Sequence, residues 1–161
     1  MNVYVDLTKI VPAAKMAGDD EDDSRLLKQM LEEAKNYVLS FTWCEGIEAS
    51  YFGLGVGGVV AVFLFRITHS RTDVDDWVWV VVGDLPPAFI TCENAPNAAC
   101  ALDGYIGAMK DWVDAIRRGV SVSELIPVNA PATPEYADML ESRLQFLRTK
   151  ILSCYQDDLK A

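Results

Sequence analysis

The sequence predicts an α+β fold in a single domain over residues 1–161: an antiparallel four-stranded meander packed by an N-terminal helix and two C-terminal helices. The run from Ala49 to Phe65 holds seventeen residues without a charge, and the segment from Trp77 to Val82 (WVWVVV) is equally apolar. Both are rich in β-branched and aromatic residues, which favour the extended chain because they pack well on a pleated surface. We therefore expect both segments to lie in the middle of a covered sheet.

The first part of the chain predicts a short strand and then a helix. Residues 1–22 form an N-terminal segment that contains an acidic run, with a short strand expected over 3–7. Asp23 or Ser24 is expected to cap a helix that runs to about Ser40. Apolar residues recur there at spacings of three and four, which places them on one helix face. These residues are Leu27, Met30, Leu31, Ala34, Tyr37, Val38 and Phe41.

Two adjacent glycines divide the long apolar run into a hairpin. Strands are predicted over 47–56 and 59–68, and Gly57-Gly58 forms the turn between them because glycine accepts the positive φ angles of tight hairpins. The run satisfies the spacing G-x-G-x-x-G, but a strand follows it where a nucleotide-binding motif needs a helix. We therefore assign the glycines to the hairpin and to close packing.

The third and fourth predicted strands are shorter. A polar turn over 69–76 leads to the third strand over 77–83. The sequence Asp84-Leu85-Pro86-Pro87 then requires a bend, and residues 88–92 give the fourth strand. Since proline cannot donate a hydrogen bond to a sheet, we expect this strand at an edge.

Two helices fill the last part of the chain. Asn94 or Asn97 is expected to cap the first, which ends at Gly119, and the connector over 120–133 leads to a second helix that begins near Pro134. The inward residues of the first are Leu102, Tyr105, Ile106, Met109, Trp112, Val113 and Ile116. Those of the second are Tyr136, Met139, Leu140, Leu144, Leu147 and Ile151.

The composition excludes several classes of function. The formal net charge is -10, and a polyanion such as nucleic acid is repelled by so acidic a protein. The longest apolar run is shorter than the ~20 residues of a membrane-spanning helix, so no membrane association is expected. The first residues have no basic segment followed by an apolar one, so we expect no secretory signal. The four cysteines match no zinc spacing, so we expect reduced thiols in a cytoplasmic protein.

Five consecutive acidic residues carry half of the negative excess: Asp19, Asp20, Glu21, Asp22 and Asp23. One interpretation is a solvated run that stabilises the N-terminus of the following helix through the helix dipole. The other is a flexible acidic arm that meets a positive surface on a partner.

The turn over 69–76 holds the best candidates for a metal site. His69 is the only histidine, and Asp73, Asp75 and Asp76 follow it closely. Carboxylates suit hard cations, and an imidazole suits a transition metal. The alternative is a solvated turn, because the spacing fits no calcium loop and an arginine lies among the ligands.

No catalytic set or cofactor signature is predicted. The sequence has no G-x-S-x-G motif and no histidine near a cysteine, so nucleophilic catalysis has little support. Asp111 and Asp114 are three residues apart on a helix, but their charged neighbours indicate a surface network. Trp77 and Trp79 alternate and so face the same side of the sheet. They are core residues in one interpretation, and in the other Trp77 anchors a protein partner.

The segment DDWVWVVVGDLPPAFI (75–90), followed by LDGYIGAMKDWVDAI (102–116), is similar in general make-up to immunity proteins that neutralise toxins delivered between bacteria. The resemblance implies a non-enzymatic protein that binds a cognate toxin, with an acidic surface against a basic active-site cleft. The expected partner-binding residues are Asp19, Asp20, Glu21, Asp22, Asp23, Asp73, Asp75, Asp76, Trp77 and Asp111.

Two alternatives of other classes stay open. The first is a small enzyme or metal-binding protein centred on the turn from His69 to Asp76. The second is a structural or adaptor subunit, including a homo-oligomer joined at a sheet edge.

Overall fold

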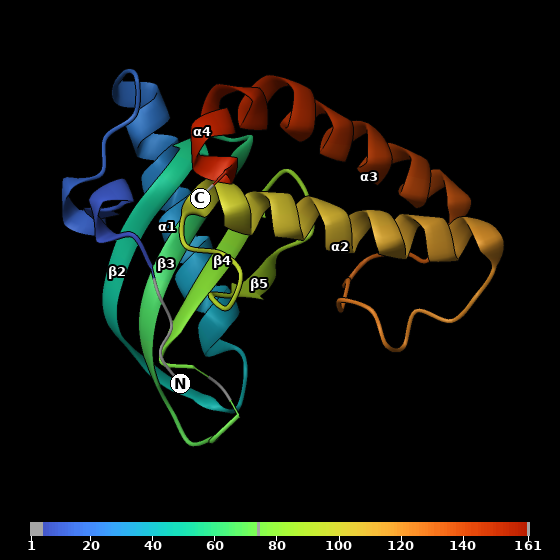
Figure 1. The fold of residues 1–161 in the computed structure, drawn as a ribbon, viewed down its shortest axis with the longest axis horizontal. Helices are drawn as coiled ribbons and strands as arrows, with labels where there is room; N and C mark the ends of the chain where they lie inside the picture. Colours follow the sequence, from blue (N-terminus) through green and yellow to red (C-terminus); the bar gives the residue numbers. More distant parts are fainter. Residues whose placement is uncertain (1–4, 74, 161) are drawn as a thin grey trace.

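The fold is α+β, an open antiparallel sheet of five strands with helices on both of its faces (Figure 1). The computed structural model describes residues 5–73 and 75–160. The strands follow one another across the sheet in sequence order. They are β1 (Val11–Pro12), β2 (Cys44–Val56), β3 (Val60–His69), β4 (Trp77–Gly83) and β5 (Ala88–Thr91). The predicted edge position of the last strand is confirmed.

The prediction of four strands is wrong by one, because β1 adds a short edge strand that pairs Val11 with Phe52. The predicted strand over 3–7 lies partly outside the described residues, and its described part is not extended into a strand. Asp6 explains this, since its carboxylate accepts from the backbone N–H of Thr8 at 3.0 Å and from the Thr8 hydroxyl at 2.6 Å. Such a local bond favours a turn over strand pairing.

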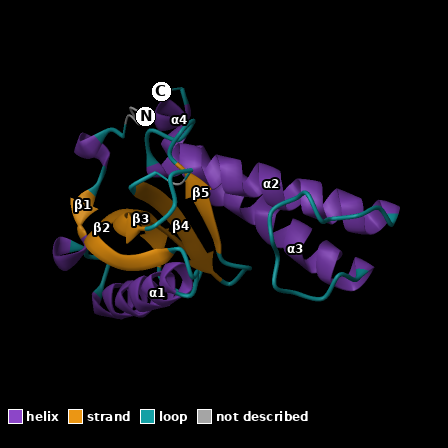
Figure 2. Cartoon of the chain, turned by 90° about the horizontal axis from the view of Figure 1, so that it is seen from below, coloured by secondary structure: helices purple, strands orange, loops and turns teal. Residues whose placement is uncertain are grey.

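Strands β3 and β4 are buried on both faces over most of their length, as predicted, whereas residues 49–56 of the first apolar run belong to β2 and are mostly only half-buried. Alternate side chains of β3 enter two separate cores: Val62 and Leu64 face one, and Phe63 and Phe65 face the other. Helix α1 (Glu21–Leu39) covers the second core, and α2 (Ala98–Arg118) covers the first. Figure 2 shows these two helices on opposite sides of the sheet. The sheet is therefore the middle layer of three.

The predicted Gly57-Gly58 hairpin is confirmed. Val59 donates its backbone N–H to the carbonyl of Val56 at 3.0 Å, and Gly58 has a φ of 78°. Gly53 on β2 serves close packing, because a Cβ there would lie 2.5 Å from the Cβ of Ala98 at the start of α2. β3 follows these glycines directly, so the helix required by the nucleotide-binding motif is absent from this place.

Helix α1 begins earlier than the sequence predicts. Its cap is Asp20 in place of Asp23 or Ser24, since the Asp20 carboxylate accepts from the backbone N–H of Asp23 at 2.8 Å. The Asp23 carboxylate accepts from the N–H of Asp19 at 2.9 Å and from the N–H of Gly57 at 2.5 Å. The acidic run is thus the cap and first turn of α1, and Asp23 joins that turn to the β2–β3 hairpin.

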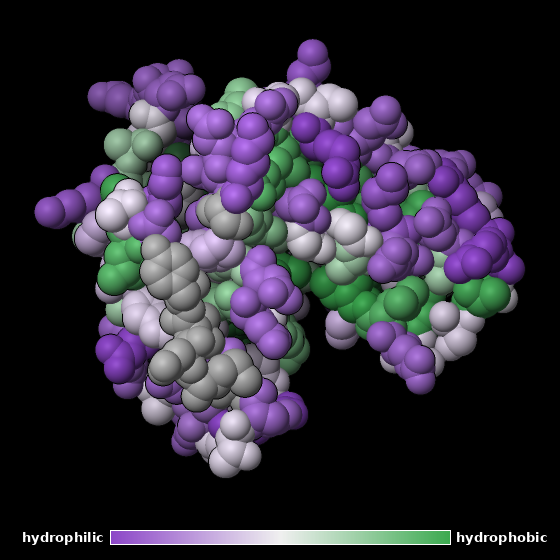
Figure 3. Space-filling model, in the orientation of Figure 1, coloured by the Kyte–Doolittle hydropathy of each residue, from purple (hydrophilic) through white to green (hydrophobic). Residues whose placement is uncertain are grey.

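Helices α2 and α3 (Pro134–Phe146) lie side by side and project beyond the sheet (Figure 1). The caps of α2 are Asn97 and Gly119, as predicted, and Gly119 has a φ of 68°. The connector over 120–133 packs four partly buried residues against the α2 core: Val122, Leu125, Ile126 and Val128. We call the projecting pair of α2 and α3, with its connector, the arm. Figure 3 shows a wide indentation between this arm and one end of the sheet.

The final helix departs from the prediction in two ways. Met139 was expected to face inward but is 42% exposed, because the buried stripe consists of Ala137, Leu140 and Leu144. Regular α-helix also ends at Phe146, and wider and tighter turns lead to α4 (Gln156–Leu159). The Thr149 hydroxyl donates to the carbonyl of Gln145 at 2.9 Å, a bond that competes with regular helix geometry.

Within the part of the chain that the structure describes, none of the helices combines the length and the apolar composition needed to cross a membrane.

The Asp23 contact predicts a measurable stability difference between neighbouring acidic residues. Replacing Asp23 with alanine leaves the N–H groups of Asp19 and Gly57 without a charged acceptor, so we expect a loss of about 2–3 kcal/mol in the free energy of unfolding. Asp22→Ala is the matched control, because Asp22 is exposed and its ion pair among the described residues is with Arg25, at 3.6 Å. This change should cost less than about 0.5 kcal/mol. Urea denaturation measures both, and equal losses would contradict the proposed link.

Candidate functional site

A hollow of about 290 Å³ lies at the end of the sheet where β4 begins and β5 ends. Because β4 and β5 are antiparallel and Val78 pairs with Thr91, the residues before β4 and after β5 meet at this end. Its lining, which we call the acidic–aromatic hollow, consists of Trp43, Arg71, Asp73, Asp75, Trp77, Val78, Phe89, Thr91 and Glu93.

The aromatic wall of the hollow is held by ring contacts. Trp43 stacks on Phe41 with ring centroids 5.2 Å apart and an interplanar angle of 25°. Phe89 meets both rings edge-on, at 5.2 Å from Phe41 and 5.6 Å from Trp43. Tyr37 adds a further edge contact to Phe41 from the last part of α1. Trp43 therefore has a fixed position between α1 and β2, although it lies in an irregular segment.

The acidic wall comes mainly from the turn between β3 and β4. Arg71 binds Asp73 through Nε at 2.8 Å and through a second, shorter contact from Nη2. The hydrogen bond from Arg71 holds the pKa of the Asp73 carboxyl below its ordinary value. Asp75 and Glu93 form no ion pair with another described residue. The hollow therefore keeps two carboxylates that no cation of the described residues balances.

The four predicted metal ligands do not converge. His69 Nε2 lies 3.1 Å from Asp76 Oδ1, whereas Asp73 is engaged by Arg71 and Asp75 lines the hollow. Among residues 5–73 and 75–160, no three His, Cys, Asp or Glu side chains gather closely enough to hold an ion. The geometry gives no support to the metal-binding alternative.

The predicted partner-binding residues lie on three separate parts of the molecule. Asp73, Asp75 and Trp77 share the hollow. The acidic run lies at the other end of the sheet, because Asp23 bonds to the β2–β3 turn and the ten residues of β3 span about 33 Å. Asp111 is exposed on α2. These residues do not form the single acidic surface that the sequence suggested.

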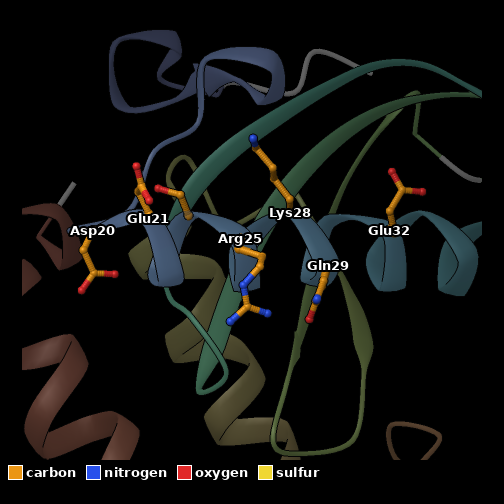
Figure 4. Close-up of a pocket in the computed structure, with 7 residues that line it drawn as sticks. Asp20, Glu21, Arg25, Lys28, Gln29 and Glu32 are labelled. Atoms are coloured by element: carbon orange, nitrogen blue, oxygen red, sulfur yellow. The ribbon is translucent and has the colours of Figure 1, made fainter.

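The outer face of α1 is a shallow, open surface. Its lining comes from α1 and its cap alone and mixes both signs of charge: Asp20, Glu21, Ser24, Arg25, Lys28, Gln29 and Glu32 (Figure 4). Side chains of one helix provide no opposite wall that would enclose a ligand. We regard this face as solvated.

Trp77 and Trp79 face the same side of the sheet, as predicted, but their surroundings differ. Trp79 is fully buried and donates its indole N–H to the carbonyl of Ala95 at 2.9 Å. Trp77 is only half-buried, and the guanidinium of Arg66 lies 5.9 Å from its ring centroid.

Sequence reasoning missed Trp43, Arg71, Phe89 and Glu93 as members of the site. Trp43 lies in the irregular segment between a helix and a strand, so no hydrophobic periodicity predicts which way its side chain points. Phe89 lies on the last strand, and Glu93 follows that strand by two residues. A signal for Glu93 existed in the predicted meander, because the residue after one strand lies beside the residue before its antiparallel neighbour.

Comparisons of the chain with protein-family models, with curated proteins and with solved structures find no match. The similarity to immunity proteins therefore stays a prediction.

The thiol next to the hollow provides a test of its burial. Burial, with a smaller contribution from the Asp75 carboxylate, raises the pKa of Cys92 to about 12. At about pH 8, roughly one such thiol in ten thousand is ionised, and the ionised thiolate is the form that reacts. Exposed Cys154 should therefore react with iodoacetamide first, and buried Cys92 only after unfolding in urea. Peptide mass spectrometry reads out each site, and equal labelling of both in the folded protein would show that this end of the sheet opens.

Proposed function

We propose that this chain is a non-enzymatic binding protein that neutralises a basic partner protein, with a cognate bacterial toxin as the partner. The observation that carries the proposal is the acidic–aromatic hollow. It places aromatic rings beside two carboxylates, Asp75 and Glu93, that form no ion pair with another described residue. Aromatic residues are enriched at the energetic centres of interfaces. Complementary charge accelerates encounter with a basic partner and disfavours acidic ones.

The alternatives receive less support from the described residues. Small-molecule pockets typically measure about 300–1,000 Å³, so the hollow is at the lower limit of that range. Assembly at a sheet edge is limited by short edge strands, since β1 has two residues, one of them a proline, and β5 has four. A binding surface for a partner side chain is the function that fits the hollow best.

The test starts with capture of partners from an extract of the source cells, followed by an assay of whether the chain inhibits the captured activity at equal stoichiometry. Two double variants then locate the contact. Asp75→Lys with Glu93→Lys changes the hollow, and Asp19→Lys with Glu21→Lys makes the same change in net charge at the opposite end of the sheet. Since Asp23 is untouched, the second variant keeps the link to Gly57.

We expect the hollow variant to slow association on the order of tenfold and to reduce the salt dependence, because it removes charge at the contact itself. The control should change association only modestly, through the shared loss of net charge. Surface-plasmon resonance at two salt concentrations measures both. Equal effects would mean that the acidic residues act only by long-range electrostatic steering. A larger effect of the control would mean that the partner contacts the acidic run and not the hollow.

A further inference from the structure

We propose that the acidic–aromatic hollow recognises a guanidinium group, an arginine side chain of the partner, in preference to the ammonium of a lysine. The proposal rests on the proposed function in one respect, since it assigns the arginine to the partner protein. Recognition of the guanidinium group itself is testable without that partner.

The two neighbouring aromatic rings contact one face and one side of Trp43. Phe41 stacks on one face of Trp43, and the three centroids of Phe41, Trp43 and Phe89 are separated by 5.2, 5.2 and 5.6 Å. Such a nearly equilateral arrangement places Phe89 beside the stacked pair. It cannot lie on the far face of Trp43, where its distance from Phe41 would be about twice as long. Neither ring therefore covers the far face of Trp43, and Trp43 is one of the residues that line the hollow.

A flat ring next to carboxylates suits a guanidinium better than an ammonium. The guanidinium is planar, stacks on aromatic faces, binds carboxylates through two parallel N–H donors and is weakly hydrated. An ammonium is compact and strongly hydrated, so it loses more solvation on entering a partly apolar hollow. Trp43 provides the ring, and Asp75 and Glu93 provide the carboxylates.

The chain already holds one of its own guanidinium groups in this way. Arg66 lies 5.9 Å from the ring centroid of Trp77, and its Nε lies 3.2 Å from a carboxylate oxygen of Glu48. A tryptophan and an acidic residue at this end of the sheet can thus accommodate a guanidinium group. In the hollow, Arg71 engages Asp73, which leaves Asp75 and Glu93 for an arginine from outside.

The experiment follows the indole N–H signals of the ¹⁵N-labelled full chain by NMR during titration with N-acetyl-arginine amide. N-acetyl-lysine amide, tetramethylammonium and the neutral N-acetyl-norleucine amide are titrated in parallel. Trp79 and Trp112 are buried and serve as internal references. Trp43→Phe assigns the Trp43 signal. We expect the arginine ligand to shift the signal of Trp43 at several-fold lower concentration than the lysine ligand.

Charge-neutral variants separate the hollow from general acidity. Asp75→Asn with Glu93→Gln should abolish the shift, whereas Asp114→Asn with Glu124→Gln, which removes the same charge from exposed positions on α2 and the connector, should leave it unchanged. Equal binding of arginine and lysine, tighter binding of tetramethylammonium, or a shift that appears only where the neutral ligand also shifts the signal would overturn the proposal.

The two proposals can fail separately. If arginine amide binds as expected but no inhibited partner is captured, guanidinium recognition stands and the toxin-neutralising function fails. If a partner binds through the hollow but keeps its affinity when its contacting arginines are changed to lysine, the binding function stands and the arginine preference is wrong.

Discussion

Strands β3 and β4 are apolar and buried on both faces from Val60 to Phe65 and from Val78 to Val82, and the arrangement of the other elements depends on covering both faces. The side facing α1 carries seven buried side chains of these two strands: Ala61, Phe63, Phe65, Ile67, Val78, Val80 and Val82. Exposing them would cost on the order of 10 kcal/mol, which is comparable to the whole stability of a typical domain at about 5–15 kcal/mol. One helix alone therefore cannot complete the fold, and α1 and α2 must lie on opposite sides.

Because helices cover both faces of the sheet, polar side chains can cluster at its two ends. At one end, Asp23 closes the β2–β3 turn against α1, so part of the acidic run is used in building the fold. At the other end, the hollow is lined by Trp43 from the segment after α1, by residues of the β3–β4 turn, and by Glu93 two residues after β5. The acidic residues there are not needed for capping a helix, which leaves them available for a partner.

The N-terminus of α2 joins several distant parts of the chain. Asn97, the one buried polar or charged residue among those that the structure describes, caps α2 by accepting from the N–H of Cys100 at 2.9 Å. It also donates to the carbonyl of Asp158 at 2.9 Å, which ties the end of the chain to the helix. Lys9 adds an ion pair with Asp158 at 3.0 Å. The long arm of α2 and α3 is thus fixed at its base, where it meets the sheet.

The sequence by itself determined the elements whose cause is local: the α+β class, the Gly57-Gly58 hairpin, the apolar β3 and β4, the Gly119 cap of α2, and an asparagine N-cap that it left between Asn94 and Asn97. Their signals lie within a few residues, in hydrophobic periodicity and in the backbone preferences of glycine and asparagine. Only the tertiary structure decided that Asp23 binds Gly57 of the hairpin, that Val11 begins a fifth strand, and that Trp43 and Glu93 meet Asp75 in one hollow. Those outcomes depend on contacts between residues far apart in the chain, and periodicity describes which face a residue takes but not which distant residue it meets.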